Sequence, residues 1–345
     1  MYLGIEIGGT KLQLGVGTGE GTDLIALERL DIDPSRGAAG ILDQIAQTGR
    51  RLIAEHQITR IGFGFGGPVD AAEGRVVTSH QIDGWDDCPL VEWCRETLGR
   101  PVVLGNDCDV AALAEATLGA GRGDRVVFFV TVGTGVGGGL VIDGRLHGSG
   151  RPAVAEIGHL RPGLDAERPD QTVESLASGR GIETVCRRRL HEISGTLSDD
   201  LLTRCGGDAH SLTAKSIAKA AADGNELAAE VLSDAVRALG WAIAQVISLI
   251  APETVVIGGG VSLMGERLFF VPLRESVERY VFPPLTDSYR IVPTELGEEV
   301  VVHGALAIAR WRALFAANGK ANLPGVAGQR KPILPKTPPG SAGSG

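Results

Sequence analysis

One local pattern occurs twice in this sequence of 345 residues: a strand, a tight glycine-rich turn and a returning strand. The first copy covers residues 1–16, with Gly8-Gly9-Thr10 at its turn. The second begins with a strand at residues 125–131, turns at residues 133–139 and returns at residues 140–142. Apolar alternation around a short glycine turn is typical of a β-hairpin. Two copies of one hairpin can present two glycine turns to the same ligand from opposite sides.

The remaining segments alternate between helical and extended patterns, as expected of a folded α/β protein. Helical spacing of apolar residues predicts helices at residues 37–56, 91–98, 110–118 and 302–317, and most clearly from Glu226 to Ile250. Apolar runs predict strands at residues 61–65, 101–104 and 254–257. Residues 318–345 are rich in proline, glycine and lysine, and a segment of this composition buries too little apolar surface to fold. We therefore predict a disordered tail.

Glycine makes up 50 of the 345 residues, about twice the usual share. Fourteen of them lie in four short segments, which we expect to approach phosphate or sugar closely, because backbone without Cβ atoms can surround an anion with N–H groups. Two segments match the GxGxxG pattern, but neither opens a helix, which disfavours a Rossmann dinucleotide site. Plain tight turns are the alternative. The fourteen are Gly8, Gly9, Gly62, Gly64, Gly66, Gly67, Gly133, Gly135, Gly137, Gly138, Gly139, Gly258, Gly259 and Gly260.

Composition argues against several classes of function. The net charge is −9 and aromatic residues make up 4%, whereas nonspecific nucleic-acid or membrane-surface binding needs basic patches. The N-terminus lacks the regions of a signal peptide, and the longest apolar stretch, Trp241 to Ala251, is too short to span a bilayer. We therefore expect a cytoplasmic protein with no nucleic-acid or membrane partner. The five cysteines lack CxxC spacing, so neither a disulfide framework nor a cysteine zinc site is expected.

Six motifs follow one another along the chain: Gly4-Ile-Glu-Ile-Gly-Gly-Thr-Lys11, Gly64-Phe-Gly-Gly-Pro68, Gly105-Asn-Asp107, Gly133-Thr-Gly-Val-Gly-Gly-Gly139, Glu156-Ile-Gly-His159 and Val256-Ile-Gly-Gly-Gly260. In this order and spacing they resemble the ROK family of bacterial sugar kinases and sugar-responsive repressors, over residues 2–312. The resemblance implies an α/β protein of the hexokinase/actin type, with two actin-like (ribonuclease H-like) domains flanking a cleft. Residues 1–107 plus 302–317 would form the small N-terminal domain, and residues 108–301 the large one.

The resemblance also implies roles for individual residues. Asp107 matches the catalytic aspartate, which would take the proton of the sugar hydroxyl as that oxygen attacks the γ-phosphate of ATP. Glu6 would organise hydrated Mg²⁺. The sugar would contact Gly67, Asn106, Asp107, Glu156, His159 and Glu174. The nucleotide would contact Gly8, Gly9, Thr10, Lys11, Gly133, Thr134, Gly135, Gly258, Gly259 and Gly260.

Several of these residues also have a purely structural interpretation. Asp107 could cap the helix that begins near Cys108. Glu156 and His159 could be a surface pair on a loop, and Glu174 could be an ordinary acid at a helix N-terminus.

Two departures from the family pattern affect the prediction. Most bacterial relatives carry a cysteine-rich zinc motif after the Gly-His, but Leu160 to Val173 contains no cysteine. We therefore predict no structural zinc, which leaves His159 to the sugar. Glu6 stands where the family usually has aspartate. Its longer side chain keeps the charge but could shift the metal or its waters, because Mg²⁺ demands near-ideal octahedral geometry.

These observations lead to one main functional hypothesis and two alternatives. The main hypothesis is an ATP-dependent hexose kinase, glucokinase-like and homodimeric, that uses ATP and Mg²⁺. The first alternative is a non-catalytic sugar sensor that acts through protein partners. A repressor is disfavoured because the hairpin starts at residue 2, which leaves no room for an N-terminal DNA-binding domain. The second alternative is an actin-like assembly protein, which would not need the polar residues of the cleft.

Overall fold

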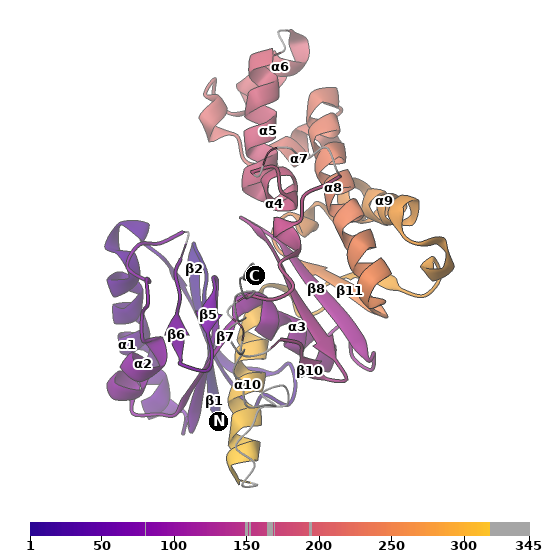
Figure 1. Ribbon diagram of the computed structural model, residues 1–345. Coiled ribbons are helices and arrows are strands. Elements are labelled where there is room, and N and C mark those ends of the chain that lie inside the picture. The colour runs from indigo at the N-terminus through magenta and orange to yellow at the C-terminus, as the bar shows by residue number, and fades with distance from the viewer. Residues whose placement is uncertain are drawn as a thin grey trace, which may run out of the picture.

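The computed structural model describes residues 1–79, 81–148, 151, 153–163, 168, 170–192 and 195–317, without the side chains of residues 312–317. The tail predicted at residues 318–345 lies outside the described residues. Two five-stranded sheets form the framework, each at the centre of a lobe (Figure 1). A short two-stranded ribbon, β5 (Val69–Asp70) with β6 (Arg75–Val76), accompanies the N-terminal sheet.

The two large sheets share one strand plan. In each, three consecutive strands form an antiparallel meander, and two later strands add in parallel beside its first strand. The duplication predicted from the hairpins therefore extends to whole sheets. The N-terminal order is β3 (Leu24–Asp31), β2 (Lys11–Gly17), β1 (Tyr2–Ile7), β4 (Arg60–Phe65) and β7 (Val102–Asn106). The C-terminal order is β10 (Arg145–Leu146), β9 (Val136–Ile142), β8 (Val126–Val132), β11 (Thr254–Gly258) and β12 (Arg290–Pro293).

Helices cover both faces of the N-terminal sheet. On the outer face lie α1 (Gly37–Glu55) and α2 (Leu90–Leu98), which bury apolar stripes such as Ile41 and Ile45 against the strands. On the inner face, α10 (Val300–Ala317) runs along β1 and β4 (Figure 1).

The C-terminal lobe is built around α8 (Glu226–Ile250). Asn225 caps its start by accepting a hydrogen bond from the N–H of Ala228, and Ala251, at φ +51°, ends it before Pro252. Among the described residues, α8 alone is long and apolar enough to cross a membrane, judged by length and composition only. Of its most apolar 18-residue stretch, 56% is buried within the protein. The lobe's other helices are α4 (Val173–Ala177), α5 (Gly179–Glu192), α6 (Thr196–Arg204), α7 (Ala214–Ala222) and α9 (Val271–Tyr280).

Two helices form a layer between the sheets. α3 (Asp107–Thr117) packs on β8 and β9, and α10 packs on β1 and β4; the two helices also contact each other. One apolar cluster joins Val110 of α3 and Val301 of α10 with Phe129 and Val256 of the C-terminal sheet. Helix α10 starts two residues before the predicted boundary. The domain boundaries inferred from the sequence remain a prediction.

Several glycines that we expected to approach a ligand instead let helices pack on strands. A Cβ atom on Gly62, in β4, would stand 2.0 Å from the carbonyl oxygen of Ala305 in α10. One on Gly139, in β9, would stand 2.5 Å from the carbonyl oxygen of Cys108 in α3. The expectation of ligand contact was wrong here because the space beside these glycines is filled by protein. Gly64, Gly137 and Gly138 also lie within these strands against other protein atoms.

Candidate active site

The polar residues of the candidate site begin where β7 ends. Asn106 caps α3: its Oδ1 accepts hydrogen bonds from the N–H groups of Cys108 (2.9 Å) and Asp109 (3.2 Å). Its Nδ2 donates to the carbonyl oxygen of Gly67 at 3.0 Å, which ties the loop after β4 to the helix. The N-cap is therefore Asn106, and Asp107 is the first residue of α3.

Asp107 has one oxygen bound to the backbone and the other near the first glycine turn. Its Oδ1 accepts from the N–H of Cys108 at 2.8 Å. A Cβ atom built on Gly66 would lie 3.4 Å from Oδ2 and 3.6 Å from the Cα of Gly8. Burial raises the pKa of Asp107 to about 6, hydrogen bonds from Cys108 oppose the rise, and the charge of Glu156 adds to it. A carboxylate with such a pKa beside a candidate phosphate turn suits a general base.

Glu6 lies on β1 and is only 7% exposed. The Nζ atom of Lys11 lies 3.6 Å from its Oε1, and the Nε2 of Gln13 donates to its Oε2 at 2.9 Å. Burial raises the pKa of Glu6 to about 7; the charge of Lys11 opposes this rise, and that of Asp107 adds to it. Lys11, predicted as a nucleotide ligand, is thus paired with Glu6 in this structure.

Two further acids interact with Asp107. One of them, Asp109, was not predicted from the sequence, and its pKa is raised to about 7 by burial and by the charges of Asp107 and Glu156. Its place in the first turn of a helix, two residues after a suspected base, is the feature that could have indicated it. Glu156 comes directly before a short 3₁₀ turn, Ile157–His159, which ends at His159, and both residues are largely exposed. Partial burial of the Glu156 carboxyl raises its pKa, His159 lowers it, and the charge of Glu174 adds to the rise.

The second glycine turn, between β8 and β9, is contacted by Glu174. The Oε2 of Glu174 accepts from the N–H of Val136 at 2.8 Å, and a Cβ on Gly135 would lie 2.5 Å from that oxygen. The carbonyl oxygen of Gly133 accepts from the N–H of Gly179 at 2.8 Å, where α5 begins. The carboxylate predicted to bind sugar therefore binds backbone of the turn predicted to hold the nucleotide.

The third glycine loop follows β11 and lies beside the second turn. Gly259 has φ +89°, and a Cβ there would stand 2.6 Å from the carbonyl group of Val132, the last residue of β8. The N–H of Val261 donates to the carbonyl oxygen of Val132 at 2.9 Å. The two loops thus meet at the carboxyl ends of neighbouring parallel strands, where open α/β sheets bind ligands.

The remaining predicted ligand residues lie at the turns. Thr10, Thr134 and Gly260 are exposed. Gly9 is covered by a side chain from a distant loop, because a Cβ at this position would overlap the Oε1 of Gln81 at 1.6 Å. The first turn is closed by a hydrogen bond of 3.0 Å from the N–H of Gly8 to the carbonyl oxygen of Lys11.

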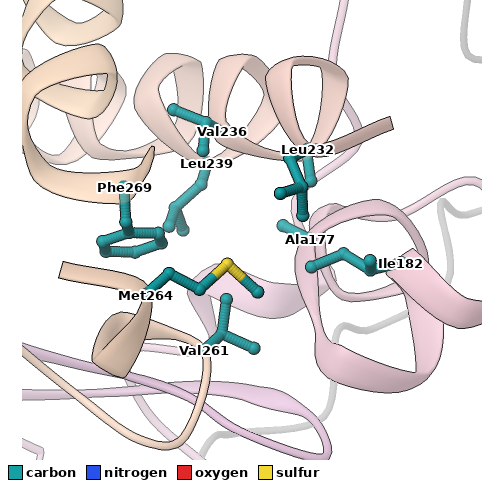
Figure 2. Close-up of a pocket in the computed structure, with 9 residues that line it drawn as sticks. Ala177, Ile182, Leu232, Val236, Leu239, Val261, Met264 and Phe269 are labelled. Atoms are coloured by element: carbon teal, nitrogen blue, oxygen red, sulfur yellow. The ribbon is translucent and has the colours of Figure 1, made fainter. Parts of the chain in front are cut away.

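A small apolar hollow lies behind the third loop, between α8 and the start of α5 (Figure 2). Val261 and Met264, which follow the glycines, face Leu232 and Leu239 of α8 across it. Its lining contains no hydroxyl, amide or charged side chain, so it cannot recognise sugar hydroxyls. It belongs to the core of the C-terminal lobe.

The carboxylates around the first turn are the candidate ligands for Mg²⁺. No group of three or more His, Cys, Asp or Glu side chains suited to a metal was found among the described residues. Mg²⁺, however, usually keeps several waters and takes only one or two carboxylates plus substrate phosphates. Glu6 and Asp107 provide two carboxylates that interact with each other near Gly8. This oxygen donor set fits a hydrated Mg²⁺ that arrives with a nucleotide.

The chain matches the ROK family over residues 2–312. A glucokinase from Thermotoga maritima is 31% identical over 311 residues, which covers 90% of this chain and 97% of that protein. This chain belongs to the ROK family. A ROK family glucokinase from Streptomyces griseus, solved with glucose and AMPPNP, matches this ROK protein with a TM-score of 0.77 at 30% identity, covering 90% of this chain and 99% of that one. The actin-like fold expected from the motifs is thereby confirmed.

Solved ROK structures also include a regulator. A ROK family transcriptional regulator, a homologue of the E. coli MLC protein, matches with a TM-score of 0.75 at 23% identity, covering 90% of this chain and 77% of that one. The fold is therefore shared by kinases and regulators, and function has to be argued from the site.

Proposed function

We propose that this ROK protein is an ATP-dependent sugar kinase that transfers the γ-phosphate of ATP to a hexose hydroxyl, with the 6-hydroxyl of glucose as the leading candidate. The observation that carries the proposal is the position of Asp107, whose Oδ1 is bound to backbone while its Oδ2 lies near Gly8 and Gly66. The glucokinases that resemble the chain along almost its whole length support the choice of glucose.

In the proposed reaction, the sugar oxygen forms a bond to the γ-phosphorus, the bond from that phosphorus to ADP breaks, and Asp107 takes the hydroxyl proton. Asn106 has one amide hydrogen left after its bond to Gly67, and it would donate this hydrogen to a sugar hydroxyl. Glu156, His159 and Glu174, with the backbone at Gly67, would complete the sugar site. Buried hydroxyls left without partners are costly, so this set would also select the sugar.

The nucleotide would lie between the first turn and the paired second and third loops. Glu6 and Asp107 would hold hydrated Mg²⁺, which neutralises phosphate charge when bound. The proposal further includes a cytoplasmic homodimer without structural zinc, nucleic-acid partner or membrane partner. The family resemblance supports the two-domain division at residues 107/108 and 301/302.

The test is a coupled assay of purified protein with ATP, Mg²⁺ and a panel of hexoses and N-acetylhexosamines. We expect turnover on glucose and its loss in Asp107→Asn. Sugar binding without turnover on any member of the panel would contradict the kinase and favour a sugar sensor. Polyphosphate in place of ATP serves as a second arm that identifies the donor.

A further inference from the structure

The first hairpin carries a buried amide that the proposed reaction does not use. Gln13 lies on β2 with 0% of its surface exposed, directly opposite Glu6 in the pairing of β1 with β2. We propose that Gln13 is a positioning residue that fixes the Glu6 carboxylate in the active site by tying it to the segment before α10. This inference rests on the proposed function, in which Glu6 faces the metal–nucleotide.

Both hydrogens of the Gln13 amide are used. The Nε2 atom donates to the Oε2 of Glu6 at 2.9 Å and to the carbonyl oxygen of Glu298 at 3.1 Å. A carboxylate and a carbonyl oxygen are both acceptors, so the amide nitrogen rather than its oxygen has to face them. This fixes the orientation of the amide and gives Glu6 a partner on the side away from Lys11.

The other end of the amide argues against a role in packing alone. The Oε1 of Gln13 is buried, and no hydrogen-bond partner for it lies in the described part of the chain. A buried acceptor without a partner costs free energy, so an apolar side chain would be more stable here if packing were the only requirement. What the amide provides is the pair of donated hydrogen bonds.

Lys11 and Gln13 hold the same two groups from neighbouring positions. They are two residues apart on β2 and so share one face of the strand. The Nζ of Lys11 lies 3.6 Å from the Oε1 of Glu6 and 3.3 Å from the carbonyl oxygen of Glu298. Lys11 supplies charge from a side chain that is 38% exposed, whereas the buried Gln13 supplies a fixed direction. Glu298 precedes α10, the helix between the two sheets.

The experiment measures binding of Mn²⁺·AMPPNP and, separately, of glucose by calorimetry. Gln13→Met keeps the size of the side chain and removes its donors. Gln44→Met is the matched control, because the half-buried Gln44 also donates from Nε2 to a backbone carbonyl, that of Asp31 at 3.0 Å, outside the site. We expect Gln13→Met to weaken Mn²⁺·AMPPNP about tenfold, as for loss of one hydrogen bond to a charged group, with glucose affinity unchanged and the control like wild type. Unchanged nucleotide binding, or equal losses for both ligands, would overturn the inference.

A second pair of variants covers the case in which Gln13→Met does not fold. In Glu6→Gln the buried charge is gone, so adding Gln13→Met should cause no further loss of Mn²⁺·AMPPNP affinity if Gln13 acts through Glu6. A further loss of affinity from Glu6→Gln to the double variant would overturn the inference. A wild-type protein that binds Mn²⁺·AMPPNP but phosphorylates no sugar would refute the proposed function and leave the positioning role testable. A wild-type protein that binds no metal–nucleotide would refute both.

Discussion

At the scale of single residues, the site concentrates negative charge. The pKa values of Glu6, Asp107 and Asp109 are raised to between about 6 and about 7. Burial is the main cause, and the charge of a neighbouring acid adds to the rise in each case. The charge of Lys11 opposes the rise in the pKa of Glu6. Such an arrangement lowers stability and is typical of a site that binds hydroxyl groups or a metal–phosphate ligand.

The substitution Asp107→Asn separates the catalytic from the structural role of this residue. Asparagine can still accept the hydrogen bond from the N–H of Cys108, but it cannot take a proton. We expect kcat to fall by about 10²- to 10⁴-fold, while glucose affinity changes by less than about threefold. Without ligand, the free energy of unfolding from thermal melts should rise by about 1–2 kcal/mol, because a carboxyl with a raised pKa is removed. Wild-type kcat in this variant would remove Asp107 from its proposed role.

The raised pKa values give opposite pH dependences for stability and rate. The folded state binds protons at Asp107 and Glu6 more tightly than the unfolded chain, because their pKa values rise from 3.8 to about 6 and from 4.5 to about 7. Their contribution therefore favours folding at low pH and is lost as pH rises from about 4 to 7. The general base must be ionised, so kcat/KM should fall as pH drops through about 6. Profiles of kcat/KM against pH test the rate, and thermal melts over the same range test the stability. A kcat/KM independent of pH between 5 and 7 would contradict the prediction.

At the scale of elements, the helices and strands were largely predictable, and the role of the strand glycines was not. The hairpins and α8 follow from local spacing and from turn residues that are neighbours in sequence. Gly62 and Gly139 were expected to approach a ligand because they belong to glycine-rich segments, but α10 and α3 lie against them. These contacts join segments far apart in the sequence. Helix α10 follows β4 by more than 200 residues, and α3 precedes β9 with β8 between them.

The close approach of α10 to β4 predicts a sensitive position at Gly62. A methyl group there would stand 2.0 Å from the carbonyl oxygen of Ala305, so the helix must shift. We expect Gly62→Ala to lower the free energy of unfolding by about 1–3 kcal/mol, measured by denaturant titration. Gly21→Ala is the control, since no atom lies within 4 Å of its Cβ position. Equal stability of the two variants would refute close packing at β4.

At the scale of the whole molecule, one buried acid links α3 to the chain that crosses between lobes. Glu115 is 0% exposed and accepts hydrogen bonds from the N–H groups of Ala120 (2.8 Å) and Leu296 (3.0 Å) and from the hydroxyl of Thr294. Thr294 and Leu296 lie between β12 and α10. Because α3 and α10 also share apolar contacts with the C-terminal sheet, the two lobes should unfold together.

Calorimetry of Glu115→Ala tests this coupling. The substitution leaves the donors of Ala120, Thr294, Glu295 and Leu296 without this acceptor. We expect the free energy of unfolding to fall by about 3 kcal/mol or more, with the single unfolding transition of the wild type moved to lower temperature. Glu73→Ala, at an exposed acid, should change the free energy of unfolding by less than about 0.5 kcal/mol. Two separate transitions in either variant would show that the lobes unfold independently.

By itself the sequence determined the duplicated hairpins, the main helices, the absence of a CxxC pair and the family, because these depend on residues close together in the chain or on motifs in a fixed order. Only the tertiary structure decided which side chains meet. Glu174 binds backbone of the second turn, Asp109 joins the acids around Asp107, and Gln13 links Glu6 to Glu298. The reason is physical: these contacts depend on how the strands are ordered and where α3 and α10 pack between the sheets, and that order is set by burial over the whole chain rather than by any local pattern.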